Sequence, residues 1–148
     1  MISKWVKDME TMHDKYGVHD WIDNKVRTED VESLTKFLEF RLAFLQEELD
    51  ETKEALANGD SKEILDGLID LCVIAIGTMD AFNADADAAW EEVLRANMDK
   101  EVGIKPSRPN PLGLPDLIKP DGWVGPDHEG KVGFLSLVTN EPEDLPKW

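Results

Sequence analysis

The sequence predicts an all-α protein, a four- to five-helix bundle with an irregular C-terminal tail rich in proline and glycine. Apolar residues recur every three or four positions before Gly103, as they do in amphipathic helices. Every proline of the chain lies after Gly103, and proline does not fit inside a regular helix. With 148 residues, of which 41% are hydrophobic, the chain can bury a core. We therefore expect a helical domain over residues 1–103 and an extended tail over residues 104–148 that packs on the bundle or on a neighbouring subunit.

The first predicted helix is short, and a loop is predicted after it. Its apolar residues are three or four positions apart: Ile2, Trp5, Val6, Met9 and Met12. Gly17 is expected to end this helix. The stretch "HDWIDNKVR", residues 19–27, is predicted to be a loop.

The second predicted helix is long and amphipathic. Thr28 is a suitable N-cap, and Glu29 and Asp30 follow it in the first turn, where negative charge is favoured. Leucine and phenylalanine then form an apolar stripe that continues to Leu56. This pattern indicates a helix with one buried face.

A tight turn is predicted at "NGD", residues 58–60. Gly59 can adopt the left-handed conformation that ends a helix, and Asp60 or Ser61 can cap the next one. The next helix, residues 63–82, is apolar on almost every side, which is typical of a central helix. The two long helices are therefore expected to form an antiparallel hairpin.

The sequence also predicts a fourth helix, allows one short strand and places the single cysteine. A fourth helix is expected within "NADADAAWEEVLRANMDK", residues 83–100, because its leading aspartates suit the positive end of a helix dipole. Residues 134–138 could form at most one short strand. The single cysteine, Cys72, lies in an apolar run and is expected to be a core residue.

The charge of the chain excludes some classes of partner. It has 32 Asp and Glu against 16 Lys and Arg, a formal net charge of -16. Such a surface repels nucleic acids and anionic membranes, so we expect neither as a partner. Leader-like and membrane-spanning apolar stretches are not recognised, and the one cysteine has no disulfide partner, so we expect a cytoplasmic protein.

Two groups of acidic residues lie on either side of the predicted turn. They are Glu47, Glu48 and Glu51 before it and Glu63, Asp66 and Asp70 after it. Spacings of three and four residues place Glu48 and Glu51 on one helix face. Residues equally distant from the turn come level in an antiparallel hairpin, so Glu51 is expected to face Asp66 and Glu48 to face Asp70. These four carboxylates are expected to converge.

Converging carboxylates need a source of positive charge. Burying ionised carboxylates together costs several kcal/mol or more, and no basic residue of the sequence lies near both groups. We therefore infer a divalent metal site, and the oxygen-only ligands favour Mg²⁺ or Mn²⁺. The alternative is a solvated acidic face without bound metal.

Several motifs together resemble a known superfamily. "EELDE" followed by an acidic motif on the next helix resembles the MazG-like all-α nucleoside triphosphate pyrophosphohydrolases, which include phosphoribosyl-ATP pyrophosphohydrolase and dimeric dUTPases. Their signature is a Glu-Glu-x-x-Glu helix and a Glu-x-x-Asp helix. "METMHDKYGV", "EEVLRANMDK" and "IKPDGWVGPD" are similar to segments of the phage and bacterial branch. The resemblance spans about residues 8–127.

The resemblance implies roles for the acidic residues. Glu48 and Glu51 would be metal ligands, and Glu47 would bind a further ion or orient the attacking water as the catalytic residue. Aligning the apolar run makes Asp70 the Asp of the family, which leaves Gly67 where its Glu should be. Asp66 is favoured as the replacement ligand, and a literal reading of "EILD" keeps Glu63 as the alternative.

The resemblance and the residue chemistry also suggest how substrate would bind. Asn97 and Lys100 would contact the sugar and the phosphates, although Leu94 stands where the family has a His. Lys119 can supply further positive charge. The aromatic side chains of His13 and Trp21 are candidates for stacking on the base.

The implied activity is a metal-dependent cleavage of a nucleoside triphosphate to a monophosphate and pyrophosphate, with two or more ions per site. The branch it resembles acts on dGTP, dCTP or dUTP, and dGTP in a phage nucleotide-pool or modified-base pathway is favoured by resemblance. Hydrolysis of ppGpp is an alternative. A rival of another class is a non-enzymatic module whose acidic face binds a basic partner. Unpaired apolar surface predicts a homo-oligomer, a dimer or tetramer in which chains could share the active site.

Overall fold

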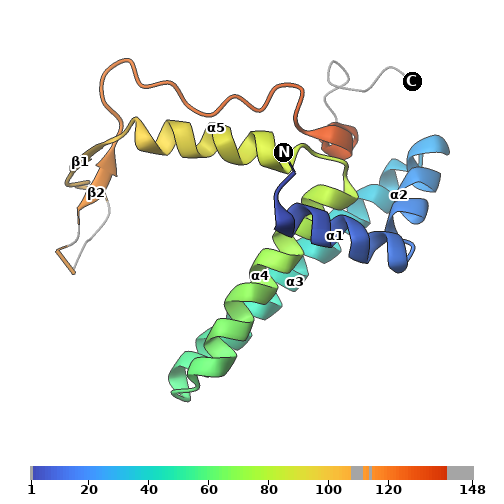
Figure 1. The fold of residues 1–148 in the computed structure, drawn as a ribbon, viewed down its shortest axis with the longest axis horizontal. Coiled ribbons are helices and arrows are strands. Elements are labelled where there is room, and N and C mark those ends of the chain that lie inside the picture. The colour runs from blue at the N-terminus through green and yellow to red at the C-terminus, as the bar shows by residue number, and fades with distance from the viewer. Residues whose placement is uncertain (1, 108–111, 114, 140–148) are drawn as a thin grey trace. The chain divides into compact units, whose positions relative to one another are not determined.

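The computed structural model confirms the all-α prediction. It describes residues 2–107, 112–113 and 115–139, and over these ranges it contains five helices, one two-stranded sheet and a 3-10 helix (Figure 1). The elements are α1 (Lys4–Lys15), α2 (Val18–Arg27), α3 (Val31–Ala57), α4 (Ser61–Ala81), α5 (Ala86–Met98), β1 (Glu101–Gly103), β2 (Asp116–Ile118) and η1 (Gly133–Leu137). They form two compact units. The first unit comprises the chain up to Ala86 and from Val132 onward, and the second unit comprises Asp87–Lys131.

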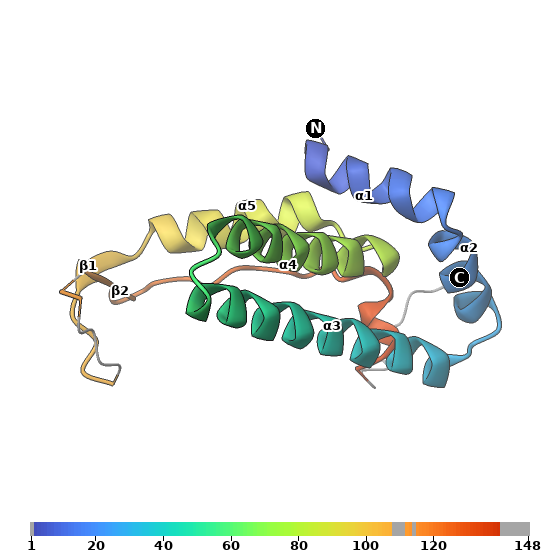
Figure 2. The same ribbon diagram turned by 90° about the horizontal axis from the view of Figure 1, so that it is seen from below.

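The predicted hairpin of long helices is confirmed. α3 and α4 lie side by side and antiparallel (Figure 2). Gly59 has a φ of 67°, the left-handed conformation expected of a helix-ending glycine. Asp60 caps α4, because its Oδ1 accepts a hydrogen bond from the Glu63 amide at 3.1 Å. The turn therefore fixes which residues of α3 lie level with which residues of α4.

α3 and α4 approach each other closely at Gly67. A Cβ atom at this position would lie 2.0 Å from Thr52 Oγ1 and 3.1 Å from Thr52 Cβ, which is too close for any side chain to fit without movement. Thr52 in turn donates its hydroxyl hydrogen to the Glu48 carbonyl oxygen at 2.7 Å. Glycine thus allows the two acidic helices to pack directly against each other.

The loop predicted for residues 19–27 is wrong, because this stretch forms most of α2. Ile22 and Val26 are buried one turn apart, and Val18 packs against the same core from the turn before them. The intervening residues are polar except for Trp21, and three apolar positions spaced by four are enough to bury one face. Gly17, with a φ of 75°, makes the bend between α1 and α2.

The predicted N-cap of α3 is also wrong. Asp30, not Thr28, caps the helix, since its Oδ1 accepts from the Ser33 amide at 3.1 Å. Thr28 is the C-cap of α2, and its hydroxyl donates to the Asn24 carbonyl at 2.8 Å. The error follows from the missed helix, because an unrecognised α2 leaves Thr28 free to serve as a helix start.

The core of the first unit joins residues from distant parts of the chain. Its buried members are Ile22, Val26, Leu34, Ala81, Phe82 and Leu137. η1 replaces the short strand that was allowed for residues 134–138. The Phe134 amide donates to the Phe82 carbonyl at 2.7 Å, at the end of α4. A strand would need a neighbouring strand as its hydrogen-bond partner, whereas this segment bonds to a carbonyl that the end of the helix leaves available. η1 thereby closes the core at the end of the hairpin.

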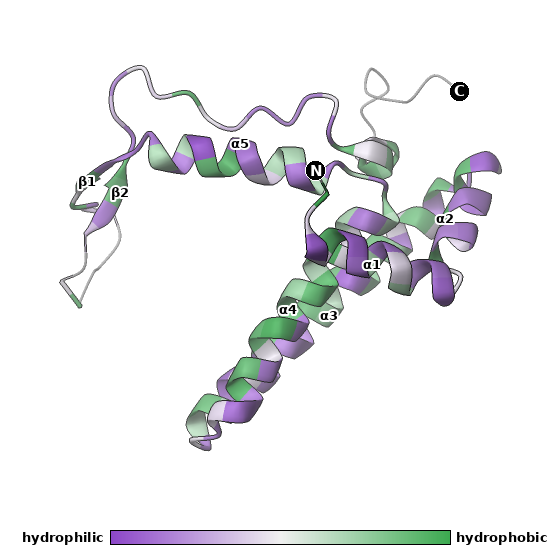
Figure 3. Cartoon of the chain, in the orientation of Figure 1, coloured by the Kyte–Doolittle hydropathy of each residue, from purple (hydrophilic) through white to green (hydrophobic). Residues whose placement is uncertain are grey.

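α4 contacts α1, α2 and α3, as expected of a central helix, and yet part of its apolar surface stays open. Leu65 is 62% exposed and Leu68 is 50% exposed within one chain. Figure 3 shows that α4 is predominantly hydrophobic along its length. Cys72 on this helix is half-buried. An apolar stripe of this kind is typical of a surface that packs against another protein.

The second unit contains α5, a small antiparallel sheet and an irregular return segment. In the sheet β1 pairs with β2, with Val102 opposite Leu117. Trp123 anchors the return segment, because its indole Nε1 donates to the Ala96 carbonyl on α5 at 2.7 Å. The tail predicted over residues 104–148 is extended between β2 and η1. Its residues 108–111, 114 and 140–148 lie outside the described residues, and the predicted division at residue 103 stays a prediction.

None of the described helices combines the length and the apolar character that a membrane-spanning segment requires.

Candidate functional site

The acidic residues predicted as ligands lie on one part of the hairpin, although within the described residues no three of them have ligand oxygen atoms within 4.8 Å of one another. Charge repulsion reveals this arrangement at Glu48, whose side chain is half-buried on α3. Desolvation raises the pKa of Glu48, and the negative charges of Glu51, Asp70, Glu47 and Asp66, in that order, raise it further. The structure therefore brings the carboxylates of both helices within electrostatic reach of Glu48.

The contact between Thr52 and Gly67 explains this arrangement. Glu48 lies one turn before Thr52 on α3, and Asp70 lies about one turn after Gly67 on α4. Because the helices are antiparallel, one turn in opposite chain directions leads to the same end of the hairpin. Gly67 also explains the departure from the family motif, since a Glu at this position would collide with Thr52.

Glu63, the alternative ligand, lies nearer the turn. It lines a hollow of about 340 Å³ together with Glu51, Glu54, Ala55, Asn58 and Asp60. Asp66 and Asp70 are among the largest causes of the raised pKa of Glu48. Around Glu48, the structure thus groups Asp66 with Asp70 and places Glu63 at the turn end of the hairpin.

No cation of the described chain balances these carboxylates. Among residues 2–107, 112–113 and 115–139, no Lys, Arg or His forms an ion pair with any member of the set Glu47, Glu48, Glu51, Asp66 and Asp70. Glu47, Glu51 and Asp66 are exposed, and Asp70 is half-buried. Oxygen-only ligands with net negative charge suit a hard divalent cation such as Mg²⁺ or Mn²⁺.

Lys100 and Lys119 meet at one aromatic ring in the second unit. Their Nζ atoms lie 5.4 Å and 4.8 Å from the centroid of the Trp123 ring, which is a cation-π arrangement. Asn97 is exposed in the last turn of α5, and its carbonyl accepts from the Lys100 amide at 3.2 Å. Two of the predicted phosphate-binding cations are therefore neighbours, and sequence reasoning gave Trp123 no part in this.

Arg95, which precedes this group on α5, is occupied by other partners. Its guanidinium bonds to the carboxylates of Glu92 at 2.7 Å and Asp99 at 3.1 Å, and to the Gly125 carbonyl at 3.0 Å. The hydrogen bond to Glu92 is the main cause that raises the pKa of Arg95. Arg95 thus fastens the return segment to α5.

The two candidates for base stacking differ in exposure. His13 is 2% exposed, so neither face of its ring is open to a nucleobase in this structure. Trp21 is 41% exposed and rests against Phe37, with ring centroids 5.5 Å apart. Lys25 Nζ lies 5.4 Å from the Trp21 ring. Trp21 therefore retains an accessible aromatic surface, and stacking by either residue stays a prediction.

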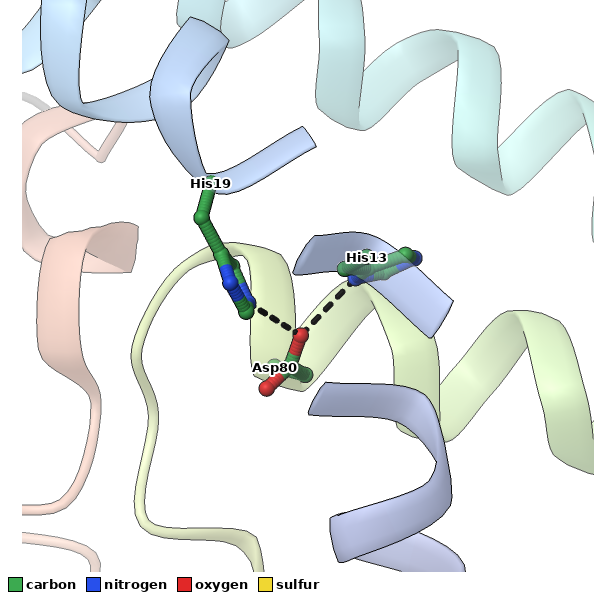
Figure 4. Close-up of side chains that lie close together, drawn as sticks. All are labelled: His13, His19 and Asp80. Carbon is green, nitrogen blue, oxygen red and sulfur yellow. Dashed lines mark hydrogen bonds and ion pairs between the residues drawn. The ribbon is translucent and has the colours of Figure 1, made fainter. Parts of the chain in front are cut away.

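A second cluster, which sequence reasoning missed, joins three helices of the first unit. Asp80 Oδ2 in the last turn of α4 accepts hydrogen bonds from His13 Nδ1 of α1 at 2.8 Å and from His19 Nε2 of α2 at 2.7 Å (Figure 4). The other ring nitrogen of His19, Nδ1, bonds to Asp14. The sequence offered a weak signal, two histidines either side of Gly17, but none that paired them with Asp80.

The two histidines respond in opposite directions to this environment. Burial lowers the pKa of His13 and outweighs its hydrogen bond to Asp80. Burial also opposes the charged form of His19, but hydrogen bonds to Asp14 and Asp80 outweigh it and raise its pKa. Arg41 disfavours a charge on His13, while its own guanidinium bonds to Thr78 Oγ1 at 3.0 Å and the Ile74 carbonyl at 3.1 Å.

Comparison with known proteins identifies the family. The family model described as phosphoribosyl-ATP pyrophosphohydrolase matches residues 16–97, which is more than half of the chain. The match covers α2, α3, α4 and most of α5, including the carboxylates around Glu48. No curated protein and no solved structure matches the chain. The chain belongs to the phosphoribosyl-ATP pyrophosphohydrolase family, within the MazG-like all-α nucleoside triphosphate pyrophosphohydrolase superfamily.

Proposed function

We propose that this protein is a metal-dependent nucleotide pyrophosphohydrolase that cleaves a (deoxy)nucleoside triphosphate to a monophosphate and pyrophosphate. Membership of the family supports hydrolysis of a phosphoric anhydride as the kind of activity. The observation that carries the proposal is the group of carboxylates around Glu48, which has no ion pair within the described part of the chain. Negative charge gathered in this way is stable when divalent cations share it.

The carboxylates would divide the work between holding metal and preparing water. Glu48, Glu51, Asp66 and Asp70 would be ligands of two or more ions, Mg²⁺ or Mn²⁺. Such ions, when bound, neutralise phosphate charge and make a bound water more acidic. Glu47, one residue from Glu48 and exposed, would bind a further ion or orient the attacking water and accept its proton. Asp66 is preferred to Glu63 because it acts electrostatically on Glu48.

The second unit would supply positive charge for the substrate. Lys100 and Lys119 share the Trp123 ring, so two ammonium groups are available to phosphate oxygens from one small surface. Asn97 has an exposed side chain that could donate to a sugar hydroxyl and accept from it. We assign these three residues to binding of the sugar and the phosphates.

The base is proposed from one exposed aromatic ring and from the family resemblance. Trp21 offers an exposed ring for stacking, and such stacking contributes about 1–3 kcal/mol without distinguishing bases. dGTP in a phage nucleotide-pool or modified-base pathway is the substrate we propose, by resemblance. dCTP, dUTP and ppGpp are the alternatives that the test below includes.

The protein would act as a homo-oligomer in the cytoplasm. The apolar stripe on α4 that includes Leu65 and Leu68 supports a dimer or a tetramer, because a single chain leaves it exposed to water. A partner copy packed there would lie along the helix that carries Asp66 and Asp70. We therefore propose that the active site includes groups from a neighbouring chain.

The test is a panel of nucleotides incubated with the full-length protein. dGTP, dCTP, dUTP, the ribonucleotides and ppGpp are each supplied with Mg²⁺, with Mn²⁺ or with EDTA, and monophosphate and pyrophosphate are quantified. We expect release of pyrophosphate with either metal and none with EDTA, with dGTP turned over fastest. Release that is equal with EDTA would refute the metal-dependent mechanism.

The rival function, an acidic module that binds a basic partner, is separated by the same panel. It requires that no nucleotide is cleaved under any metal condition. A chain of net charge -16 would then still bind a polylysine peptide, with an affinity that falls as salt is added. Pyrophosphate release removes the need for this reading.

A further inference from the structure

The cluster of His13, His19 and Asp80 has the features of a second metal site. The three side chains come from α1, α2 and α4, and one ligand atom from each lies within 4.8 Å of the other two. In the described ranges of the chain, no other group of three or more His, Cys, Asp or Glu side chains has its ligand atoms this close. Figure 4 shows both imidazole rings directed at the same carboxylate.

The hydrogen bonds around His19 follow the pattern of a metal-ligating histidine. Such a histidine presents one nitrogen to the metal and donates its other N–H to a carboxylate, which fixes the tautomer and the ring plane. In His19, Nε2 faces Asp80 and Nδ1 faces Asp14. When an ion replaces the proton on Nε2, the proton on Nδ1 can stay bonded to Asp14, and the Nε2 lone pair would then point at the ion. An arrangement that served merely to hold Asp80 would not need the bond to Asp14.

The cluster is accessible and its charge suits a cation. The side chains of His13 and Asp80 are 3% and 8% exposed, but that of His19 is 26% exposed, so solvent reaches the cluster on the α2 side. Asp14 and Asp80 contribute two negative charges, and the C-terminal end of α4, where Asp80 lies, adds the negative end of a helix dipole. Arg41 opposes them with one positive charge, and its guanidinium donates hydrogen bonds to the Thr78 hydroxyl and the Ile74 carbonyl.

We propose that His13, His19 and Asp80 bind a divalent transition metal ion of the Zn²⁺ class, with water in the fourth position. Two imidazole nitrogens and one carboxylate oxygen are a ligand set that Zn²⁺ favours and that Mg²⁺ does not. Bonds of about 2.0–2.1 Å in a tetrahedron require ligand atoms roughly 3.3 Å apart, so the present bonds of 2.8 Å and 2.7 Å need to open by about half an ångström. Both distances share the Asp80 oxygen, so a small shift of the Asp80 carboxylate together with the partly exposed His19 ring is required.

The consequence of binding is structural. An ion held by α1, α2 and α4 would join the two N-terminal helices to the end of the hairpin by coordinate bonds. The ring nitrogens of His13 and His19 that face Asp80 must give up their protons when the ion binds, so binding would release protons and weaken in acid. This site rests on none of the carboxylates around Glu48, and its presence or absence is independent of the proposed catalytic function.

The experiment measures binding and stability, not turnover. Metal-free full-length protein is titrated with Zn²⁺ and, separately, with Mg²⁺ by calorimetry, and its Tm is recorded with each ion. We expect one Zn²⁺ per chain in this site and a rise in Tm with Zn²⁺ that depends on His19, whereas any rise in Tm with Mg²⁺ would come from the carboxylates around Glu48 and should not depend on His19. Co²⁺ bound in its place should give the intense visible absorption of a tetrahedral site.

Variants separate this site from adventitious binding. His19→Gln should remove the Zn²⁺-dependent rise in Tm, and Asp14→Asn should weaken Zn²⁺ binding by about 10- to 100-fold while all three ligands remain. His128→Gln is the matched control, because His128 lies in the second unit, and it should bind Zn²⁺ as the wild type does.

Two results would overturn the proposal. One is the absence of a Zn²⁺-dependent change in Tm in the wild type. The other is a Zn²⁺ affinity that His19→Gln leaves unchanged, which would show that the ion binds surface carboxylates. His19 is partly exposed, so this variant is expected to fold, and circular dichroism in the absence of metal checks that it does.

Discussion

The two clusters of ionisable side chains in the first unit differ in how their charge is balanced. Around Glu48, acidic side chains of α3 and α4 repel one another, and no ion pair relieves them in the described part of the chain. Around Asp80, a single carboxylate is held by two histidines from other helices. The first arrangement lowers stability through repulsion, whereas the second contributes two hydrogen bonds to a charged acceptor.

The ligand types differ in the same way. The Glu48 cluster offers oxygen atoms alone, and its members are exposed or half-buried. The Asp80 cluster offers two nitrogen atoms and one oxygen atom, and two of its three side chains are buried. Hard cations prefer the first set and borderline transition metals prefer the second. One chain could thus hold two kinds of metal with little exchange between the sites.

The largest expected effect is on catalysis. Glu48→Gln keeps the shape of the side chain and removes its charge, so it should lower the rate of pyrophosphate release by about 10²- to 10⁴-fold, since metal-assisted charge stabilisation is worth several kcal/mol. Glu32→Gln is the matched control, because Glu32 lies on α3 and pairs with Lys36 at 2.9 Å. Equal activity of the two variants would remove Glu48 from the mechanism.

The next effect concerns the glycine that lets the acidic helices meet. Gly67→Ala should lower the free energy of unfolding by about 1–2 kcal/mol, because overpacking against Thr52 outweighs the gain in helix propensity. Urea denaturation measures it. Adding Thr52→Ala removes the nearest atom and should restore part of the loss. If Gly67→Ala alone is as stable as the wild type, the helices are not in the contact described.

The Asp80 cluster should respond to neutralisation with the opposite sign from Glu48. Asp80→Asn leaves two histidines without their charged acceptor, so the free energy of unfolding should fall by about 1–3 kcal/mol. Metal-free Glu48→Gln should be as stable as the wild type or more so, because repulsion is relieved. Asp8→Asn, which breaks an exposed pair with Lys4, is the control and should change little. Equal losses in the two cluster variants would contradict the comparison.

The smallest effect is a dependence on pH. The pKa of Glu48 is raised in the folded chain, so its contribution to stability is fully present below the ordinary glutamate pKa of 4.5 and is lost as the pH rises through the folded value. Metal-free Glu48→Gln should therefore exceed the wild type in stability at neutral pH, and the difference should vanish in acid. Chemical denaturation of both proteins between pH 4 and pH 7 gives the difference directly. A difference that grows toward acid would mean that the pKa of Glu48 is lowered.

The hairpin could be predicted because its signals are local. Gly59 and Asp60 lie next to each other and carry the turn and the cap between them. The pairing of Glu48 with Asp70 was predicted from two quantities, the position of the turn and the period of the helix. Asp70 is one of the charges that raise the pKa of Glu48, and the role of both residues as metal ligands stays a prediction.

What could not be predicted depends on contacts far apart in the chain. Asp80 and His13 are separated by 67 positions, and neither has a neighbour in sequence that points to the other. A loop was predicted for most of α2 because polar residues separate Ile22 from Val26. These two side chains are buried by Phe82 and η1, which lie far away in the sequence. Gly67 looked like a gap in an acidic motif, and its contact with Thr52 gives the steric reason.

The position of η1 has a consequence for how the chain folds during synthesis. Phe134 and Leu137 complete a core whose other members, such as Ile22 and Leu34, leave the ribosome far earlier. The nascent hairpin therefore emerges with the end of its apolar seam open, and it stays so until residue 137 has cleared the exit tunnel. Chaperones that recognise exposed apolar segments would have their longest opportunity on this protein at that stage.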